Sequence, residues 1–293
     1  MYIYVTSTPE AGTGVCAMPA ATAREKVRPA AVAGRFYPAD PARMRAEVAR
    51  FLAEADAPAT VAPAALIAPH AGYVYSGRVA GAAFATLRGV AARIARVVIV
   101  GPAHYVPVRG IAIPTVDAFE TPLGTVAVDR AAFAALAALA CVIETDRPHA
   151  PEHALEVELP FLQAVLPAFR LVPVLVGEAR PQDVAEVLAR VWDGPRTLVV
   201  ASSDLSHYHD YDTARRLDAA TAAAIERGEE TALGPAQACG WLAVAGLLRE
   251  SARRGLAARR LALCNSGDTA GPREQVVGYG AWSFEPPAGH SLH

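Results

Sequence analysis

Residues 66–77 read LIAPHAGYVYSG, an apolar run that stops at His70 and then passes through two glycines. A hydrophobic run that ends in a polar, glycine-containing turn before a helix is how an α/β sheet delivers a side chain to a site. The same arrangement recurs in residues 96–104, RVVIVGPAH, and in residues 197–207, TLVVASSDLSH. The sequence therefore predicts three strands that each end close to a histidine.

Strands and helices continue to alternate through the rest of the chain. Residues 171–177, LVPVLVG, predict another strand, and residues 182–191 and 211–227 predict helices. Such alternation is typical of a mostly parallel central sheet with helices on both faces. No linker rich in proline, serine or glycine and no run of charges divides the chain. We therefore predict a single α/β domain over residues 28–286.

The two ends of the chain depart from this pattern. Residues 1–27 mix Thr, Ser, Pro, Gly and Ala without periodicity, so we expect a disordered N-terminal tail. Residues 287–293 are expected to form a short C-terminal tail. The segment 33–37, AGRFY, is apolar and aromatic but too short for a core strand, and we expect it to pack beside the site.

Capping and turn residues predict where several elements begin. Asp40 is expected to cap a helix whose first residue is Pro41, and Ser76 to cap the helix after the first histidine. Residues 111–114 and 125–128 are predicted to be strands, and their closeness in sequence favours antiparallel pairing.

The composition argues against several classes of function. The 293 residues are 53% hydrophobic, with a formal net charge of −2 and a pI near 6.5, so there is no electrostatic footprint for nucleic acid. No apolar run approaches the roughly 20 residues that a membrane-spanning helix needs, so no membrane is expected as a partner. The cysteines form no CxxC pair, which makes a reducing, cytoplasmic setting the default expectation; they are Cys16, Cys141, Cys239 and Cys264.

The candidate site residues lie where the predicted strands end. Ligands in open α/β sheets gather outside the carboxyl ends of the strands, where His70, His104, Asp204 and His207 are all expected. Neutral imidazole is the commonest metal ligand among side chains that ionise near neutral pH, so the three histidines together favour a metal site. A metal needs more than two imidazoles, and the sequence leaves four candidates for the next ligand: Cys239, Glu152, Asp204 and His207.

Two of these candidates have alternative interpretations. Cys239 precedes Gly240 and a predicted helix, whose N-terminus favours a thiolate, although a buried apolar cysteine is the commoner role. Residues 202–207, SSDLSH, contain the residue types of a catalytic triad, but the GxSxG elbow is absent and a triad is normally assembled from separate segments. His207 as a general base near Asp204 is the better use of these residues.

Several motifs in a fixed order resemble the Memo family, and more closely its prokaryotic branch, which is called AmmeMemoRadiSam system protein B. The resemblance covers residues 28–284 and is carried by APHAGYVYSG, GPAHY, ETPLG, EHALEVELPFLQ, PVLVG, SSDLSHY, the CG pair and VVGYG.

This resemblance implies a fold similar to that of class III extradiol dioxygenases, which hold non-haem Fe(II) at the strand ends with two histidines and a glutamate. The Memo pattern instead implies two histidines and a cysteine, which are His70, His104 and Cys239 in this sequence. His207 then occupies the place of the dioxygenase base, with Asp204 beside it. A further pair, Glu152 and His153, is implied to line the pocket.

Two hypotheses of different classes follow from these residues. The first is a metal-dependent, oxidoreductase-like enzyme, with Fe(II) as the expected metal and Cu or Zn as alternatives, since a thiolate ligand suits all three. The second is a non-catalytic metal-binding or peptide-binding adaptor module. It would recognise a small molecule or a peptide in the pocket that corresponds to the dioxygenase active site. The resemblance also implies a functional link to AMMECR-type and radical SAM proteins.

Overall fold

Four parallel, almost fully buried strands form the centre of the molecule. The structure is a computed structural model that describes residues 25–55 and 62–286. In spatial order the central strands are β2 (Ala65–Ala68), β9 (Thr197–Ser202), β3 (Arg96–Pro102) and β8 (Arg170–Val176). Their continuous apolar runs are what parallel strands covered on both faces require. The predicted α/β class is confirmed.

Further strands, mostly antiparallel to their neighbours, extend this core into a mixed sheet of nine. On one side, β4 (Ile111–Ile113) is antiparallel to β8, and β7 (Val142–Glu144) is parallel to β4. On the other side, β12 (Val276–Glu285) is antiparallel to β2 and pairs with both β11 (Ala257–Asn265) and β10 (His207–His209). The parallel arrangement predicted for the sheet therefore holds for its centre.

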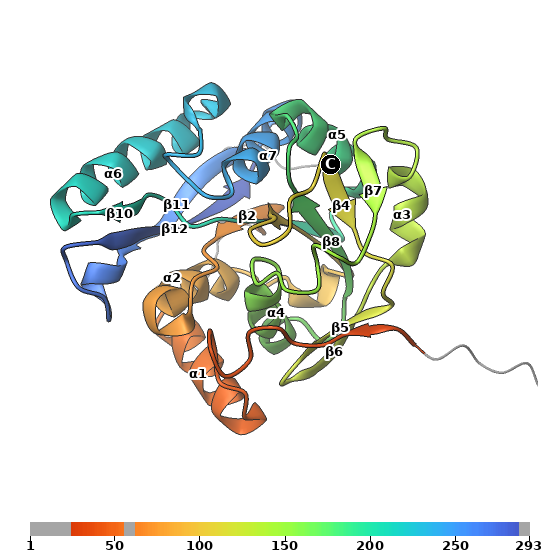
Figure 1. Cartoon of the computed structure of the whole chain (residues 1–293), viewed down its shortest axis with the longest axis horizontal. Helices are drawn as coiled ribbons and strands as arrows, with labels where there is room; N and C mark the ends of the chain where they lie inside the picture. Colours follow the sequence, from red (N-terminus) through yellow and green to blue (C-terminus); the bar gives the residue numbers. More distant parts are fainter. Residues whose placement is uncertain (1–24, 56–61, 287–293) are drawn as a thin grey trace, which may run out of the picture.

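Helices cover both faces of this sheet (Figure 1). On one face α1 (Pro41–Ala53), α2 (Tyr73–Ala85) and α4 (Leu159–Val165) pack together, and on the other α5 (Pro181–Val191) packs against α7 (Trp241–Arg253). The remaining helices are α3 (Arg130–Leu136), α6 (Tyr211–Arg227) and the short 3-10 turns η1 (Ala91–Arg93), η2 (Glu156–Glu158), η3 (Glu230–Ala232) and η4 (Ser266–Asp268). Within residues 25–55 and 62–286, no helix combines the length and the apolarity needed to cross a membrane.

The capping predictions succeed for α1 and fail for α2. Asp40 accepts a hydrogen bond of 2.8 Å from the amide of Arg43 at the start of α1, as predicted. Ser76 does not cap α2, because this helix already begins at Tyr73, and the Ser76 hydroxyl donates to the carbonyl of Ala71 instead. The early start arises because the Tyr73 amide finds an acceptor outside the helix, the carbonyl of Phe36, at 2.8 Å.

The predicted pairing of residues 111–114 with 125–128 is wrong. Residues 111–113 form β4 in the main sheet, where all three side chains are buried. The antiparallel partner of β6 (Gly124–Ala127) is β5 (Ala118–Thr121), which the sequence pattern did not reveal. These two strands and β1 (Val27–Arg28) make a separate three-stranded sheet.

The expected N-terminal tail, residues 1–27, lies outside the described residues except for its last three positions. Of these, Val27 already belongs to β1, and the Lys26 side chain contacts Thr115 and Asp146. Lys26 and Val27, which precede the predicted domain start at Arg28, therefore both contact residues of the domain. The expected C-terminal tail, residues 287–293, lies outside the described residues.

Candidate metal centre

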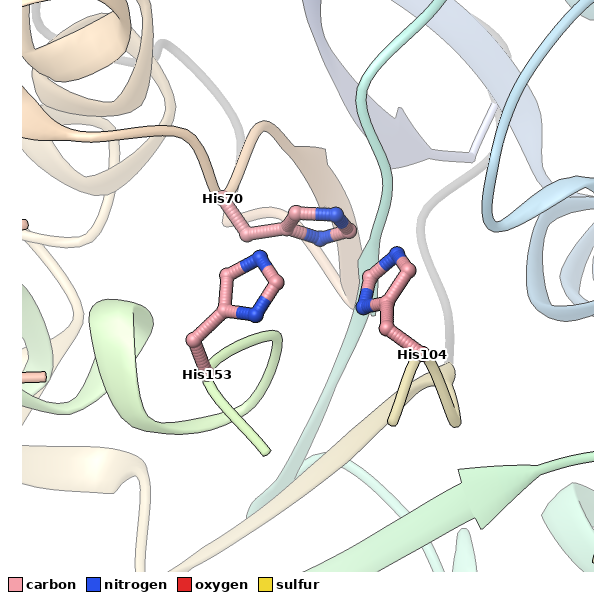
Figure 2. Close-up of side chains that lie close together, drawn as sticks. All are labelled: His70, His104 and His153. Atoms are coloured by element: carbon pink, nitrogen blue, oxygen red, sulfur yellow. The ribbon is translucent and has the colours of Figure 1, made fainter. Parts of the chain in front are cut away.

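Three histidines meet at the carboxyl ends of the central strands. His70 follows β2 and His104 follows β3, and both strands are neighbours of β9. His153 reaches the same place from the turn that precedes η2. One ring nitrogen from each histidine lies within 4.8 Å of those of the other two, and the three rings point toward one another (Figure 2).

The rings pack closely enough to serve one ion. The His104 and His153 rings are nearly parallel with centroids 4.8 Å apart, and the His70 ring stands edge-on to both at 5.1 and 5.3 Å. Burial lowers the pKa of His70, and the neighbouring imidazoles lower it further. His70 is therefore neutral, which is the form that offers a nitrogen lone pair to a metal.

Glu152 orients His104 and the turn that carries His153. One carboxylate oxygen lies 2.9 Å from His104 Nδ1, and the other accepts the His104 amide at 2.6 Å. The first oxygen also accepts the amides of His153 and Ala154, and it lies 3.1 Å from His153 Nδ1 without hydrogen-bond geometry. Burial opposes ionisation, yet these bonds hold the pKa of Glu152 well below its usual range. The carboxylate thus fixes a proton on His104 Nδ1 and leaves Nε2 free.

Cys239 lies beside His70 but outside the group of three histidines. Its Sγ is 3.2 Å from His70 Nε2, and burial raises the pKa of the thiol to about 12. The thiol reaches this position because Gly240 packs directly against the end of β9. A Cβ at Gly240 would lie 2.6 Å from the carbonyl oxygen of Ser202, so a larger residue would push Cys239 away from the site.

Asp204 lies on the loop that leaves β9, and His207 is the first residue of β10, which follows that loop. Asp204 is buried, and its carboxylate accepts the amide of His70 at 2.9 Å. Burial raises the pKa of Asp204, and the charge of a protonated His207 would oppose that rise. The His207 Nδ1 lies 2.7 Å from the carbonyl of Leu205, so the backbone contact holds Nδ1 and not Nε2. The Asp204 carboxylate thus contacts the turn that carries His70, and His207 is close enough for its charge to affect the pKa of Asp204.

An N-terminal clamp, which we define as residues 26–37, secures the turn that carries His153. The segment 33–37 packs beside the site as expected, with the Phe36 ring 4.7 Å from that of His153. Arg28 pairs with buried Glu156 and donates to the carbonyl of Glu152 at 2.5 Å. The contacts of Arg28 within this clamp were not predicted, because a lone arginine carries no signal of its partner. The only available hint was a basic residue just before an aromatic segment.

The buried side chain of His149 should make the free energy of unfolding depend on pH. The ring is buried, and burial lowers its pKa from 6.5 to about 4. The unfolded chain therefore binds a proton at His149 between about pH 6.5 and pH 4 while the folded chain does not. This one group should lower the free energy of unfolding by about 1.4 kcal/mol per pH unit as pH falls through that window.

Urea denaturation of wild type and His149→Gln between pH 7 and pH 4.5 checks this expectation. The variant is expected to be less stable at pH 7, and the gap should narrow as the pH falls. Parallel stability curves for the two proteins would show that His149 titrates normally in the folded state.

The comparisons with known proteins agree on one family. The family model described as Memo-like protein matches residues 28–283. The chain belongs to the Memo family. Among relatives, a MEMO1 family protein of Archaeoglobus fulgidus is 36% identical over 264 residues, which cover 86% of this chain and 97% of that relative. One of Methanopyrus kandleri is 36% identical over 285 residues, covering 88% and 98%.

Membership of the Memo family places the chain among proteins with a class III extradiol dioxygenase-like fold, as the resemblance implied. The geometry of the site shows in addition that the cluster of His70, His104 and His153 can hold a metal ion. Of the residues implied as ligands, His70 and His104 belong to this cluster, and Cys239 lies next to it. His153, expected only to line the pocket, is the third member. The EHALEVELP motif marked its position, but nothing local in the sequence distinguishes a ligand from a lining residue.

Proposed function

We propose that this Memo family protein binds one Fe(II) ion through His70, His104 and Cys239 and has an oxidoreductase-like function. The observation that carries the proposal is the convergence of the imidazoles at the strand ends with a thiol beside them. Three protein ligands leave an open coordination position, which is typical of functional rather than structural metal sites.

The distance between His70 and Cys239 supports a shared ion. With metal–nitrogen distances of about 2.0 Å and metal–sulfur distances of about 2.3 Å, tetrahedral ligands lie about 3.5 Å apart. The Nε2 to Sγ distance of 3.2 Å is close to that separation. A metal would also stabilise the thiolate that burial otherwise disfavours. Nitrogen ligands with one thiolate suit Fe(II), Cu and Zn, so Cu and Zn remain the alternatives to iron.

His153 is the competing third ligand. Its nitrogen belongs to the cluster, whereas Cys239 approaches only the His70 side. A site with three imidazoles and no thiolate would be harder in character and less sensitive to oxidation. His70 and His104 are common to both ligand sets.

The metal would supply redox or Lewis-acid chemistry, and the surrounding residues would handle protons. We assign His207 as the group that accepts or delivers a proton, because its Nε2 is free of the backbone contact that holds Nδ1. Asp204 positions the His70 turn through its bond to the His70 amide and, as a carboxylate, would stabilise a protonated His207.

Exposed aromatic side chains support a ligand at this site and keep the adaptor alternative open. Tyr75, Tyr105 and Tyr208 follow the three strand-end histidines by one to five residues and are exposed. Tyr208, 71% exposed, has a φ of 62°, an unfavourable conformation for a tyrosine that is often found at functional sites. Exposed aromatic rings of this kind suit a small aromatic molecule or a peptide. A non-catalytic metal-binding or peptide-binding adaptor would use the same surface.

The family resemblance supports a further proposal about context, a role alongside AMMECR-type and radical SAM proteins in a modification system. Co-expression followed by co-purification tests it. Retention of either protein type by wild type but not by Tyr105→Ala would place the contact at the metal site, and absence of retention in both would count against the link.

Metal analysis of protein purified without oxygen tests the function. We expect about one metal ion per chain, with iron most abundant, and a sharp loss in Cys239→Ser. The cysteine controls Cys141→Ser and Cys264→Ser should keep the wild-type content, and His207→Ala should also keep its metal while losing ligand affinity. Full metal in Cys239→Ser with loss in His153→Ala would assign the third ligand to His153. Metal-free wild type would refute the proposed function.

A further inference from the structure

The Ser202 hydroxyl lies at the centre of a buried hydrogen-bond cluster that the proposed function does not explain. Ser202 ends β9 and has no solvent exposure. Its Oγ lies 2.9 Å from His70 Nδ1, 2.6 Å from the carbonyl oxygen of Ala154 and 2.9 Å from Glu158 Oε1. Three polar atoms therefore contact one hydroxyl group.

The chemistry of a hydroxyl limits how these contacts can be made. A serine side chain donates one hydrogen bond and accepts two. The Ala154 carbonyl can only accept, so the short contact of 2.6 Å requires the Ser202 proton. With its proton committed to Ala154, Ser202 can only accept from its other two neighbours. His70 Nδ1 and the Glu158 carboxyl must then both be donors.

We infer that Ser202 holds the His70 proton on Nδ1, leaving Nε2 free for a metal, and that Glu158 is a neutral carboxylic acid that completes this arrangement. Ser202 and Glu158 are positioning residues, because they act on the metal site only through His70. The inference deepens the proposed function, on which its metal-binding consequence rests.

The surroundings of Glu158 support its neutral form independently of the donors and acceptors around the Ser202 hydroxyl. Glu158 has no solvent exposure, and its Oε2 has no hydrogen-bond partner. No cation pairs with it among the ion pairs of residues 25–55 and 62–286, and an unpaired buried carboxylate is far more costly than a buried neutral acid. Burial correspondingly raises the pKa of Glu158 well above its usual range.

The two ligand histidines are thus oriented by different means. His104 donates its Nδ1 proton to an ionised carboxylate, Glu152, whereas His70 donates to a neutral hydroxyl. A carboxylate acceptor strengthens the ligand basicity of an imidazole, and a hydroxyl acceptor does so less. His70 should therefore be the weaker donor to the metal, and the more dependent on correct placement of its proton.

Nitrogen NMR of the metal-free protein tests the His70 tautomer without requiring that the protein bind metal. Long-range proton–nitrogen spectra, with His70 assigned from His70→Gln, should show the proton on Nδ1 in wild type and a mixture or the opposite tautomer in Ser202→Ala. The matched control is Ser251→Ala. This variant also removes a buried hydroxyl, but on α7 rather than at the end of β9, and it should leave the His70 tautomer unchanged. An unchanged His70 in Ser202→Ala overturns the role of Ser202.

Infrared spectroscopy tests the Glu158 half of the inference. The difference spectrum between wild type and Glu158→Gln should contain the carbonyl stretch of a protonated carboxylic acid. The amide of Glu158→Gln can still donate to Ser202, so the His70 tautomer should persist in this variant. A carboxylate signal in place of the acid band overturns the neutral assignment.

Metal titration connects the tautomer to binding. Ser202→Ala should weaken Co(II) or Zn(II) binding by about 10-fold to 100-fold, the usual effect of losing a partner of a ligand histidine, and Glu158→Gln should bind like wild type. If wild type binds neither metal, the proposed function fails while the tautomer result stands. If wild type binds and Ser202→Ala binds equally well, the proposed function survives and the positioning role is overturned.

Discussion

Replacement of His70 by alanine is expected to abolish stable metal binding. His70 is the one residue that contacts Cys239 and also belongs to the histidine cluster, so every ligand set that the site allows includes it. Four-ligand zinc sites bind with about 10–16 kcal/mol, or about 2.5–4 kcal/mol per ligand, which predicts a loss of affinity on the order of 100-fold. Metal analysis of anaerobic protein, followed by competition with a chelator, measures this loss.

The control for this experiment is His209→Ala. His209 is a half-buried histidine of β10 outside the cluster, so this variant should retain the wild-type metal content. Thermal unfolding of both metal-free variants excludes misfolding as the cause of metal loss. Wild-type metal content in His70→Ala would show that the ion binds elsewhere.

Replacement of Arg28 by methionine is expected to destabilise the fold by about 3–5 kcal/mol, the usual cost of leaving one partner of a buried ion pair uncompensated. Arg28 is only 3% exposed, and its partner Glu156 has no exposure. The same guanidinium donates to the carbonyls of His149 and Glu152 at 2.8 and 2.5 Å. Methionine keeps the length of the side chain but offers no donor to any of these oxygens. Urea denaturation gives the change in free energy of unfolding.

Two further variants isolate the cause of that destabilisation. Arg190→Met removes an exposed partner of Glu186 on α5 and should cost less than about 1 kcal/mol. Adding Glu156→Gln to Arg28→Met removes the buried negative charge and should recover part of the lost stability. A small effect of Arg28→Met, similar to that of Arg190→Met, would mean that the clamp contributes little. A weaker metal affinity in Arg28→Met is also expected, because Arg28 holds the turn of Glu152 and His153.

The sequence alone determined the features that depend on neighbouring residues. Continuous apolar runs specify buried parallel strands, and the glycine-containing turns after two of them place His70 and His104 at the same edge of the sheet. The Asp40 cap and the segment that packs on His153 were likewise predictable, because hydrophobic spacing and capping chemistry act over a few residues. Motifs in a fixed order were sufficient to identify the Memo family.

Only the tertiary structure decided which distant residues complete the site. Arg28 and Glu156 lie 128 positions apart, His70 and Cys239 lie 169 apart, and no local pattern encodes either pairing. The same limit explains the strand that was paired wrongly, since β4 is recruited by β8 rather than by its neighbour in sequence. His153 joins the histidine cluster because the clamp and Glu152 hold its turn against the strand ends. These contacts join side chains and backbone groups that only folding brings together. The sequence therefore predicts which side chains lie at the strand ends, but not the full set of groups around them.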